Sequence, residues 1–244
     1  MNAPRFHVPE AAPGARVSLP DHAAHHAREV LRLGAGASVR IFDGRGSEFE
    51  AILETVTSRS VEARLGGPVE ARPESPLRLV LAMAPLKGDR MELVIQKATE
   101  LGVSEIRPVV TARTDAAARP ALRGSRQERW DKVASGAAEQ CGRAVVPDVA
   151  PTCTLDRFLA EPFDGSRLLL LETQGVPSLA SRVGPATSAV LLLLGPAGGW
   201  EPAEAERIVA AGFESVSIGP RILRAETAAI AAVALVQALW GDLR

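Results

Sequence analysis

Two stretches near the end of the chain decide its fold: residues 189–199, AVLLLLGPAGG, and residues 214–227, ESVSIGPRILRAET. Each opens with a strand-length run and continues into a turn that contains Gly and Pro, which is typical of a strand followed by a loop. In a parallel sheet, ligands bind in a crevice outside the carboxyl ends of the strands. The two turns are therefore expected to line one site, although GPAGG taken alone is more often a simple turn.

Upstream patterns place these stretches in a larger sheet. Strands are expected at Leu77–Met83, Glu105–Val110, Arg167–Leu171, Ala189–Leu194 and Glu214–Ile218. Helices are expected at Asp89–Leu101 and Ser125–Gln140, where Asp89 with Glu92 and Ser125 with Glu128 have capping-box spacing. The alternation of strands and helices predicts an α/β fold with a mostly parallel sheet and helices on both faces.

The first third of the chain has a different pattern, with several short strands and one helix. Strands are expected at Arg5–Val8, Arg16–Leu19, Val39–Phe42, Ser47–Val56 and Ser60–Leu65, with a hairpin turn at Asp43–Gly44. The helix is expected at Asp21–Leu33, capped by Asp21. We interpret this part as a small β-barrel. The stretch Gly66–Pro76 is the expected linker between domains at residues 1–70 and 76–244.

Composition excludes several protein classes. The 244 residues carry 28 Lys+Arg against 29 Asp+Glu, and 46% are hydrophobic, which excludes a disordered chain. No apolar run is long enough to cross a bilayer, and the first residues lack the apolar core of a signal peptide. A cytoplasmic location and no membrane partner are therefore expected.

Metal binding is not expected either. There are two cysteines, Cys141 and Cys153, without a pattern of zinc ligands. His22, His25 and His26 share a helix face at metal-ligand spacing, but without further ligands a solvated polar face is the preferred interpretation.

The last helix, Ala225–Trp240, is apolar or small on every face except near its start. Such a helix must be covered all round. A second copy of the chain is the favoured cover, because a domain of this size has little room for an enclosed helix. A central helix in the core of a single chain is the alternative.

Charged residues gather at two places. Arg224 precedes the last helix, where a cation opposes the helix dipole and is expected to have an anionic partner. Glu226 and Thr227 there could simply cap the helix. A basic stretch forms either a solvated helix face or a phosphate-contacting patch; its members are Arg107, Arg113, Arg119, Arg123, Arg126, Arg129, Lys132 and Arg143.

Together these segments resemble the SPOUT class of RNA methyltransferases, and within it the family that methylates N3 of a uridine in bacterial 16S ribosomal RNA. The resemblance covers nearly the whole chain. Its motifs are RFHVP at 5–9, HHAREVLRLGAG at 25–36, IFDGRG at 41–46, the long segment at 86–114, EQCGRAVVPDV at 139–149, LLLLGPAGGW at 191–200 and SIGPRILRAETAAIAAV at 217–233.

The resemblance implies a PUA-like N-terminal β-barrel that binds RNA and a C-terminal SPOUT domain with a trefoil knot. It implies a homodimer with an active site drawn from both chains, acting on 16S rRNA or the small ribosomal subunit. The implied cofactor is S-adenosyl-L-methionine, with S-adenosyl-L-homocysteine as product and no metal. The implied cofactor residues are Leu171, Glu172, Gly195, Pro196, Ala197, Gly198, Gly199, Ile218, Gly219, Leu223, Arg224, Glu226 and Thr227.

The loop at 195–199 departs from the family pattern, which usually has Glu where Ala197 stands here. Glu201 or Glu226 could supply the missing carboxylate.

Uridine N3 must lose its proton before it can accept a methyl group. For the catalytic groups we predict Arg224 or Arg143 as the guanidinium that balances the resulting charge and Glu139 or Glu226 as the proton acceptor. The RNA contacts expected are Arg5, Arg113, Arg123, Arg126 and Arg143. The alternatives are a non-catalytic RNA-binding assembly factor on the same scaffold and methylation of another RNA base.

Overall fold

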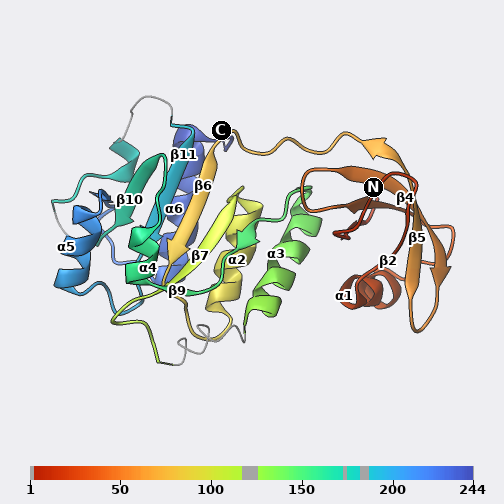
Figure 1. The fold of residues 1–244 in the computed structure, drawn as a ribbon, viewed down its shortest axis with the longest axis horizontal. Coiled ribbons are helices and arrows are strands. Elements are labelled where there is room, and N and C mark those ends of the chain that lie inside the picture. Colours follow the sequence, from red (N-terminus) through yellow and green to blue (C-terminus); the bar gives the residue numbers. More distant parts are fainter. Residues whose placement is uncertain (1–2, 117–125, 173–174, 182–186, 244) are drawn as a thin grey trace. The chain divides into compact units, whose positions relative to one another are not determined.

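The computed structural model describes residues 3–116, 126–172, 175–181 and 187–243 (Figure 1). The chain divides into two compact units: unit 1 comprises Met1–Glu74 and Ser135–Val146, and unit 2 comprises Ser75–Ala134 and Pro147–Arg244. The domain ranges 1–70 and 76–244 expected from the sequence do not include this exchange of residues 135–146. As domain boundaries they stay a prediction.

Unit 1 is a curled five-stranded sheet with the strand order β1-β3-β4-β5-β2. Its strands are β1 (Arg5–His7), β2 (Arg16–Ser18), β3 (Ser38–Phe42), β4 (Glu48–Val56) and β5 (Val61–Val69). Strand β1 runs parallel to β3, and the remaining neighbours are antiparallel. The predicted barrel is thus a half-barrel, because β1 and β2 are the two ends of the strand order and do not pair with each other.

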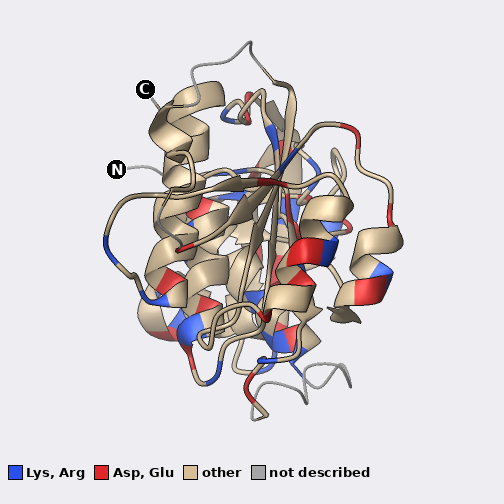
Figure 2. Cartoon of the chain, turned by 90° about the vertical axis from the view of Figure 1, so that its left-hand side faces the viewer, with Lys and Arg blue, Asp and Glu red and all other residues tan. Residues whose placement is uncertain are grey.

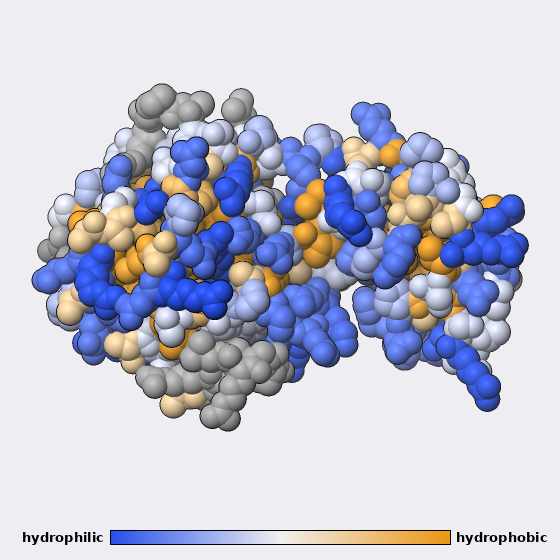
Figure 3. Space-filling view, in the orientation of Figure 1, coloured by the Kyte–Doolittle hydropathy of each residue, from blue (hydrophilic) through white to orange (hydrophobic). Residues whose placement is uncertain are grey.

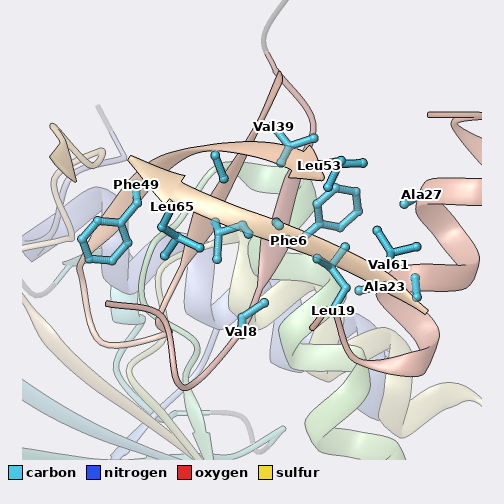
Figure 4. Close-up of a cluster of buried hydrophobic side chains, with 14 residues drawn as sticks. Phe6, Val8, Leu19, Ala23, Ala27, Val39, Phe49, Leu53, Val61 and Leu65 are labelled. Atoms are coloured by element: carbon cyan, nitrogen blue, oxygen red, sulfur yellow. The ribbon is translucent and has the colours of Figure 1, made fainter. Parts of the chain in front are cut away.

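One face of this sheet forms the core of unit 1. Alternate residues of β4 and β5, such as Leu53 and Val61, point inward with Phe6 from β1 (Figure 4). Ala23 and Ala27, from the helical segment after β2, complete this cluster. Their small side chains let the helical segment pack close to the sheet. The period-two alternation expected of a half-buried sheet is therefore realised.

The helical segment of unit 1 is shorter and wider than predicted. The α-helix α1 covers Asp21–His25 and continues as a π-helical turn, η1 (His26–Val30). Asp21 is the first helical residue and makes no capping hydrogen bond, and the segment ends before Leu33.

The predicted hairpin is confirmed between β3 and β4. The Asp43 carboxylate accepts hydrogen bonds from the backbone N–H groups of Arg45 and Ser47 at 2.8 and 3.0 Å. Partial burial would raise the pKa of Asp43, but these hydrogen bonds outweigh it and lower the pKa. Gly44 has φ +76°, and a Cβ there would lie 2.5 Å from Nε2 of His7, so only glycine fits.

The linker begins later than predicted. Strand β5 continues through Gly66 and Gly67 to Val69, since a bulge opposite Glu50 lets it pair with the start of β4. Beyond it, Glu74 still belongs to unit 1 and binds Arg143.

Unit 2 contains a parallel sheet with the order β12-β10-β11-β6-β7-β8, and β9 also pairs with β7. Every recorded pairing in it is parallel, as predicted. The strands are β6 (Arg78–Met83), β7 (Glu105–Val110), β8 (Asp148–Val149), β9 (Cys153–Thr154), β10 (Ser166–Leu170), β11 (Ala189–Leu194) and β12 (Glu214–Val216). Strand β11 is buried along its whole length, as expected between two covered faces.

Helices cover both faces of this sheet (Figure 1). On one face, α4 (Leu155–Ala160) and α5 (Pro202–Ala210) contribute Phe158 and Ile208 to a cluster with the strands. On the other, α6 (Ala225–Trp240) packs against α2 (Arg90–Glu100) and β11. The α/β class is therefore confirmed. In the view of Figure 3, hydrophilic residues separate the apolar patches on the surface of unit 2.

The capping box predicted for α2 does not form. Asp89 precedes the helix without a side-chain capping bond, and instead Asp89 and Glu92 both pair with Arg129 at 3.3 and 2.7 Å. Arg129 lies in α3 (Gln127–Cys141); Ser125, the cap predicted for α3, lies outside the described residues.

Leu53→Ala should lower the free energy of unfolding by about 2–5 kcal/mol, because it removes a fully buried side chain and leaves a cavity. The neighbouring Ile52 points to the other face and is 45% exposed, so Ile52→Ala should cost only about 0.5 kcal/mol. Urea denaturation of both variants measures the difference. Equal losses would contradict the assignment of the two faces of β4.

Candidate active site

Three loops meet at the carboxyl edge of the sheet of unit 2. Strand β10 lies between β11 and β12 and is parallel to both. The residues that follow β10 and β11 and those that precede α6 therefore converge, although they come from distant parts of the sequence.

These loops enclose a cavity of about 650 Å³, within the range of cofactor sites, about 300–1,000 Å³. Most of the residues predicted from the family resemblance line it: Leu171, Glu172, Gly195, Pro196, Ala197, Gly199, Leu223, Arg224 and Glu226. Four others do not line it: Gly198, Ile218, Gly219 and Thr227. Whether the lining residues bind a cofactor stays a prediction.

Sequence reasoning missed several residues of this cavity. Arg90 reaches it from the start of α2, and Trp200 and Ala205 come from the loop before α5 and from α5 itself. No local pattern marks Arg90, because its place depends on the packing of α2 against α6. Ile222, which also lines the cavity, is 81% exposed.

Gly195 is required by Trp200. A Cβ at residue 195 would lie 2.8 Å from the indole ring, so only glycine lets this ring close on the backbone. The resemblance implies Gly195 as a cofactor residue, and the structure gives a separate, steric reason for glycine at this position.

Glu226 is the most unusual side chain in the cavity. The residue is only 8% exposed, and its Oε2 atom has no hydrogen-bond partner within the described chain. The nearest cation, Nη1 of Arg90, lies 3.9 Å from Oε2, beyond hydrogen-bonding distance. A buried acceptor without a donor suits a ligand that brings a cation or an N–H group.

Arg224 is the residue before the first turn of α6 and is exposed. Among the described residues, no acidic side chain forms a recorded ion pair with it, so the anionic partner expected from the sequence is not found there. Its guanidinium is available to a ligand in the cavity that it lines.

The carboxylate missing at Ala197 has two candidate replacements. Glu226 lines the cavity, whereas Glu201 does not and lies 3.7 Å from Nε of Arg113. The geometry favours Glu226 for this task.

Arg5 has a structural task in unit 1. Its five N–H groups point at five acceptors: both carboxylate oxygens of Glu48 at 2.9 Å, and the carbonyl oxygens of Ala138, Glu139 and Arg143 at 3.0, 3.3 and 3.0 Å. Its guanidinium also lies 4.7 Å above the ring of Phe42. An RNA phosphate would have to displace one of these acceptors, so the geometry does not favour the predicted RNA contact.

Arg143 is also tied within unit 1. It is 9% exposed, and its Nη2 and Nε atoms lie 2.6 and 2.9 Å from Oε2 of Glu74. Its predicted roles in catalysis and RNA binding would require this partly buried ion pair with Glu74 to open, so the geometry does not favour them.

Glu139 lies in the same unit, near His7. The backbone N–H of His7 donates to Oε1 of Glu139 at 2.8 Å, and the His7 ring pairs with Ser135 at 2.8 Å. Burial raises the pKa of Glu139 to about 7, although the His7 hydrogen bond and the charge of Arg5 pull it down. Burial also lowers the pKa of His7. A carboxyl group with a pKa near neutrality suits a proton acceptor, and that role of Glu139 stays a prediction.

The remaining predicted RNA contacts are placed as follows. Arg113 is half-exposed in unit 2, and Arg126 is partly buried just before α3. Arg119 and Arg123 lie outside the described residues.

No group of three or more His, Cys, Asp or Glu side chains among the described residues could hold a metal ion. None of the described helices combines the length and the apolar character needed to traverse a bilayer.

Comparison with known proteins identifies clear relatives. Residues 73–237 match a family described as an RNA methyltransferase domain, and residues 19–66 match the RNA methyltransferase PUA domain. Ribosomal RNA small subunit methyltransferase E of Synechocystis sp. is 34% identical over 236 residues, which cover 95% of this chain and 76% of the relative. The protein of the same name from Bacillus subtilis is 30% identical and covers 90% and 88%.

A solved structure is similar to this chain over its whole length. The crystal structure of ribosomal RNA small subunit methyltransferase E from Neisseria gonorrhoeae, bound to S-adenosyl methionine, has a TM-score of 0.88 to this chain and 35% identity. The match covers 100% of both chains.

Glu139→Gln should change how stability depends on pH. The folded pKa of about 7 lies above the ordinary value of 4.5, so the stability contributed by protonation is complete below about pH 4.5 and is lost as the pH rises through 7. Glu139→Gln carries no ionisable group at this position, so it does not lose this stability as the pH rises. Its stability relative to wild type should therefore rise between pH 5 and pH 8 by on the order of 1–3 kcal/mol, measured by urea denaturation. Parallel curves for the two proteins would contradict the raised pKa.

Proposed function

Because this chain belongs to the RNA methyltransferase family, we propose that it methylates N3 of one uridine in the 16S rRNA of the small ribosomal subunit, in the cytoplasm. The enzyme class and the small-subunit rRNA methyltransferase type follow from the family and the relatives. The observation that supports the chemistry is the cavity, lined by the guanidinium of Arg224 and by the carboxylate of Glu226, whose Oε2 atom has no hydrogen-bond partner in the described chain.

The cavity fits S-adenosyl-L-methionine, the cofactor of this enzyme. Apolar side chains of Leu170, Leu171 and Leu194 suit a flat adenine ring, and the buried carboxylate of Glu226 suits a cationic ligand. When bound, S-adenosyl-L-methionine supplies the methyl group and leaves as S-adenosyl-L-homocysteine. No metal is needed for this transfer.

Glu226 and Arg224 would prepare the uridine. Glu226 accepts the proton of uridine N3 through its unpaired oxygen, which leaves negative charge on the ring and its carbonyl oxygens. The guanidinium of Arg224 donates hydrogen bonds to that charge. Nη1 of Arg90 lies 3.9 Å from Oε2 of Glu226 and places a positive charge beside this carboxylate.

Glu139 and Arg143 are the alternative acceptor and cation. Arg143 is engaged by Glu74, which favours Arg224 for the second task. The raised pKa of Glu139 supports it as the alternative proton acceptor.

RNA binding would involve both units. The PUA-like unit 1 offers shape and backbone contacts, and Arg113 and Arg126 of unit 2 offer cations for phosphates. Affinity should therefore fall steeply with salt concentration.

The decisive experiment maps methylated uridines in 16S rRNA from cells with and without this protein, and repeats the reaction with purified protein, S-adenosyl-L-methionine and small subunits or naked rRNA. One N3-methyluridine should disappear with the protein and return on complementation. Loss of a different modified base would replace the uridine in the proposal. Failure of the protein to bind millimolar cofactor in calorimetry would instead favour the non-catalytic assembly factor.

Glu226→Gln and Arg224→Ala should each reduce kcat about 100-fold or more, because they remove the proton acceptor and the donor to the ring oxygens. Glu206→Gln and Arg221→Ala are matched controls, since both residues are exposed and neither lines the cavity. Radiolabelled methyl transfer measures all four. Full turnover in Glu226→Gln would transfer its task to Glu139.

A homodimer is part of the proposal. Helix α6 buries Ala229 and Val233 inside unit 2, while Ile230, Ala231 and Ala234 remain partly exposed. In Figure 2 the helix end nearest the C label carries no charged residue. An uncharged, partly exposed apolar stripe of this kind is typical of a face that another protein surface covers, and a second copy is the occupant that the resemblance implies.

Ala234→Glu should convert a dimer into a monomer, because it places a charge in the middle of this stripe while keeping a good helix former. Ala210→Glu, at an exposed alanine of α5, is the control and should leave the mass unchanged. Sedimentation equilibrium gives the mass of each. A wild-type monomer, or a dimer that survives Ala234→Glu, would contradict the assignment of this face.

A further inference from the structure

A buried carboxylate lies behind the glycine-rich loop, outside the cavity. Glu204, in the first turn of α5, is 8% exposed. One of its oxygens accepts the backbone N–H of Ala112 at 2.8 Å, and the other accepts the backbone N–H of Glu201 at 3.4 Å. Glu204 thus joins the loop after β7 to the end of the loop after β11.

Arg113 makes a second connection between the same two loops. Its Nη1 donates to the carbonyl oxygen of Gly198 at 3.2 Å, and its Nε lies 3.7 Å from the carboxylate of Glu201. A Cβ built on Gly198 would be in van der Waals contact with Cβ of Arg113 at 3.4 Å, so the two backbones also lie close together.

The loop that supplies Ala112 and Arg113 is itself well held. Oγ1 of Thr114 accepts the backbone N–H of Thr111 at 2.9 Å and lies 3.1 Å from Oγ1 of Thr111. Both threonines are buried. The loop after β7 is therefore ordered by its own hydrogen bonds, independently of the contacts that Glu204 and Arg113 make.

The glycine-rich loop, by contrast, has little to hold it from within. Residues 195–199 contain three glycines, and one backbone bond, from Gly199 to Pro196 at 2.9 Å, closes its turn. Glycine gives up more conformational freedom on ordering than other residues. A ligand that ordered a loose loop would lose that free energy from its affinity.

We propose that Glu204 and Arg113 are positioning residues that hold the loop at 195–199 in its cofactor-binding shape. Neither residue lines the cavity, so neither contacts the cofactor. This inference depends on the proposed function only in that the cavity binds S-adenosyl-L-methionine; it does not depend on which base is methylated. It gives Arg113 a second role besides the predicted RNA contact.

The charge of the cofactor separates positioning from electrostatics. S-adenosyl-L-methionine is a sulfonium cation, so removing a nearby positive charge should tighten its binding if charge alone mattered. Loss of a positioning contact should weaken binding. Arg113→Ala should therefore lower the Kd of the cofactor if only charge matters, and raise it if Arg113 positions the loop.

The test is the Kd of S-adenosyl-L-methionine, measured by calorimetry on the full-length protein without RNA. We expect Glu204→Ala to raise Kd about tenfold and Arg113→Ala about threefold, from the loss of two backbone hydrogen bonds and of one, respectively. Glu204→Gln keeps one acceptor oxygen and should fall between wild type and Glu204→Ala. For Glu204→Ala, the methyl-transfer assay should show a higher KM for the cofactor, while kcat at saturating cofactor should stay within about twofold.

Gln237→Ala is the matched control for a purely structural effect. Gln237 is fully buried in α6, accepts from Ser75 at 2.8 Å and donates to the carbonyl of Gly102 at 3.1 Å, away from the loop. It should lower Tm, as Glu204→Ala does, without changing Kd. If Glu204→Ala does not fold, the surface variant Arg113→Ala carries the test. An unchanged or tighter Kd in Arg113→Ala, or an equal rise in Gln237→Ala, would overturn the proposal.

Discussion

The pairing of β10 with β11 on one side and β12 on the other is the constraint on which the cavity depends. All three strands are parallel, so their carboxyl ends share one edge. The strands β10 and β11 are apolar and largely buried, and slipping either by one residue would exchange its two faces. The ends of these strands, where the loops of the cavity begin, are therefore fixed in register at this edge.

The arginines of this chain show how surroundings divide one residue type into different tasks. Arg5 uses all five donors inside unit 1, and Arg143 is held by Glu74. Arg113 shares its guanidinium between a loop carbonyl and solvent. Arg224, without a recorded acidic partner in the described chain, lines the cavity. The density of acceptors around each guanidinium decides what it is free to bind.

Three carboxylates differ in the same way. Glu204 has backbone donors for both oxygens, and Glu139 has one from His7 together with the charge of Arg5. Glu226 has an oxygen with no donor in the described chain. Satisfied buried carboxylates hold structure, whereas an unsatisfied one in a cavity is suited to a ligand.

Local sequence was sufficient where the physical signal is local. The apolar run between Arg224 and Gly241 predicted α6 with approximate ends that match the structure, and the run at 189–194 predicted β11. Half of the residues that line the cavity were predicted, because the family motifs carry them on the loops next to these elements. The capping box predicted at Asp89 and Glu92 was wrong, since both carboxylates pair with Arg129 from a different helix.

By itself, the amino-acid sequence determined the fold class and the strands and helices next to the site, and its family motifs marked the loops between them. Only the tertiary structure decided which charged side chains face the cavity. Arg90 enters it because α2 packs on α6, and Arg5 is removed from solvent because the end of α3 offers it carbonyl oxygens. Both results depend on contacts between residues far apart in the sequence. Sequence periodicity and residue propensity report only on local structure, so they could not predict these contacts.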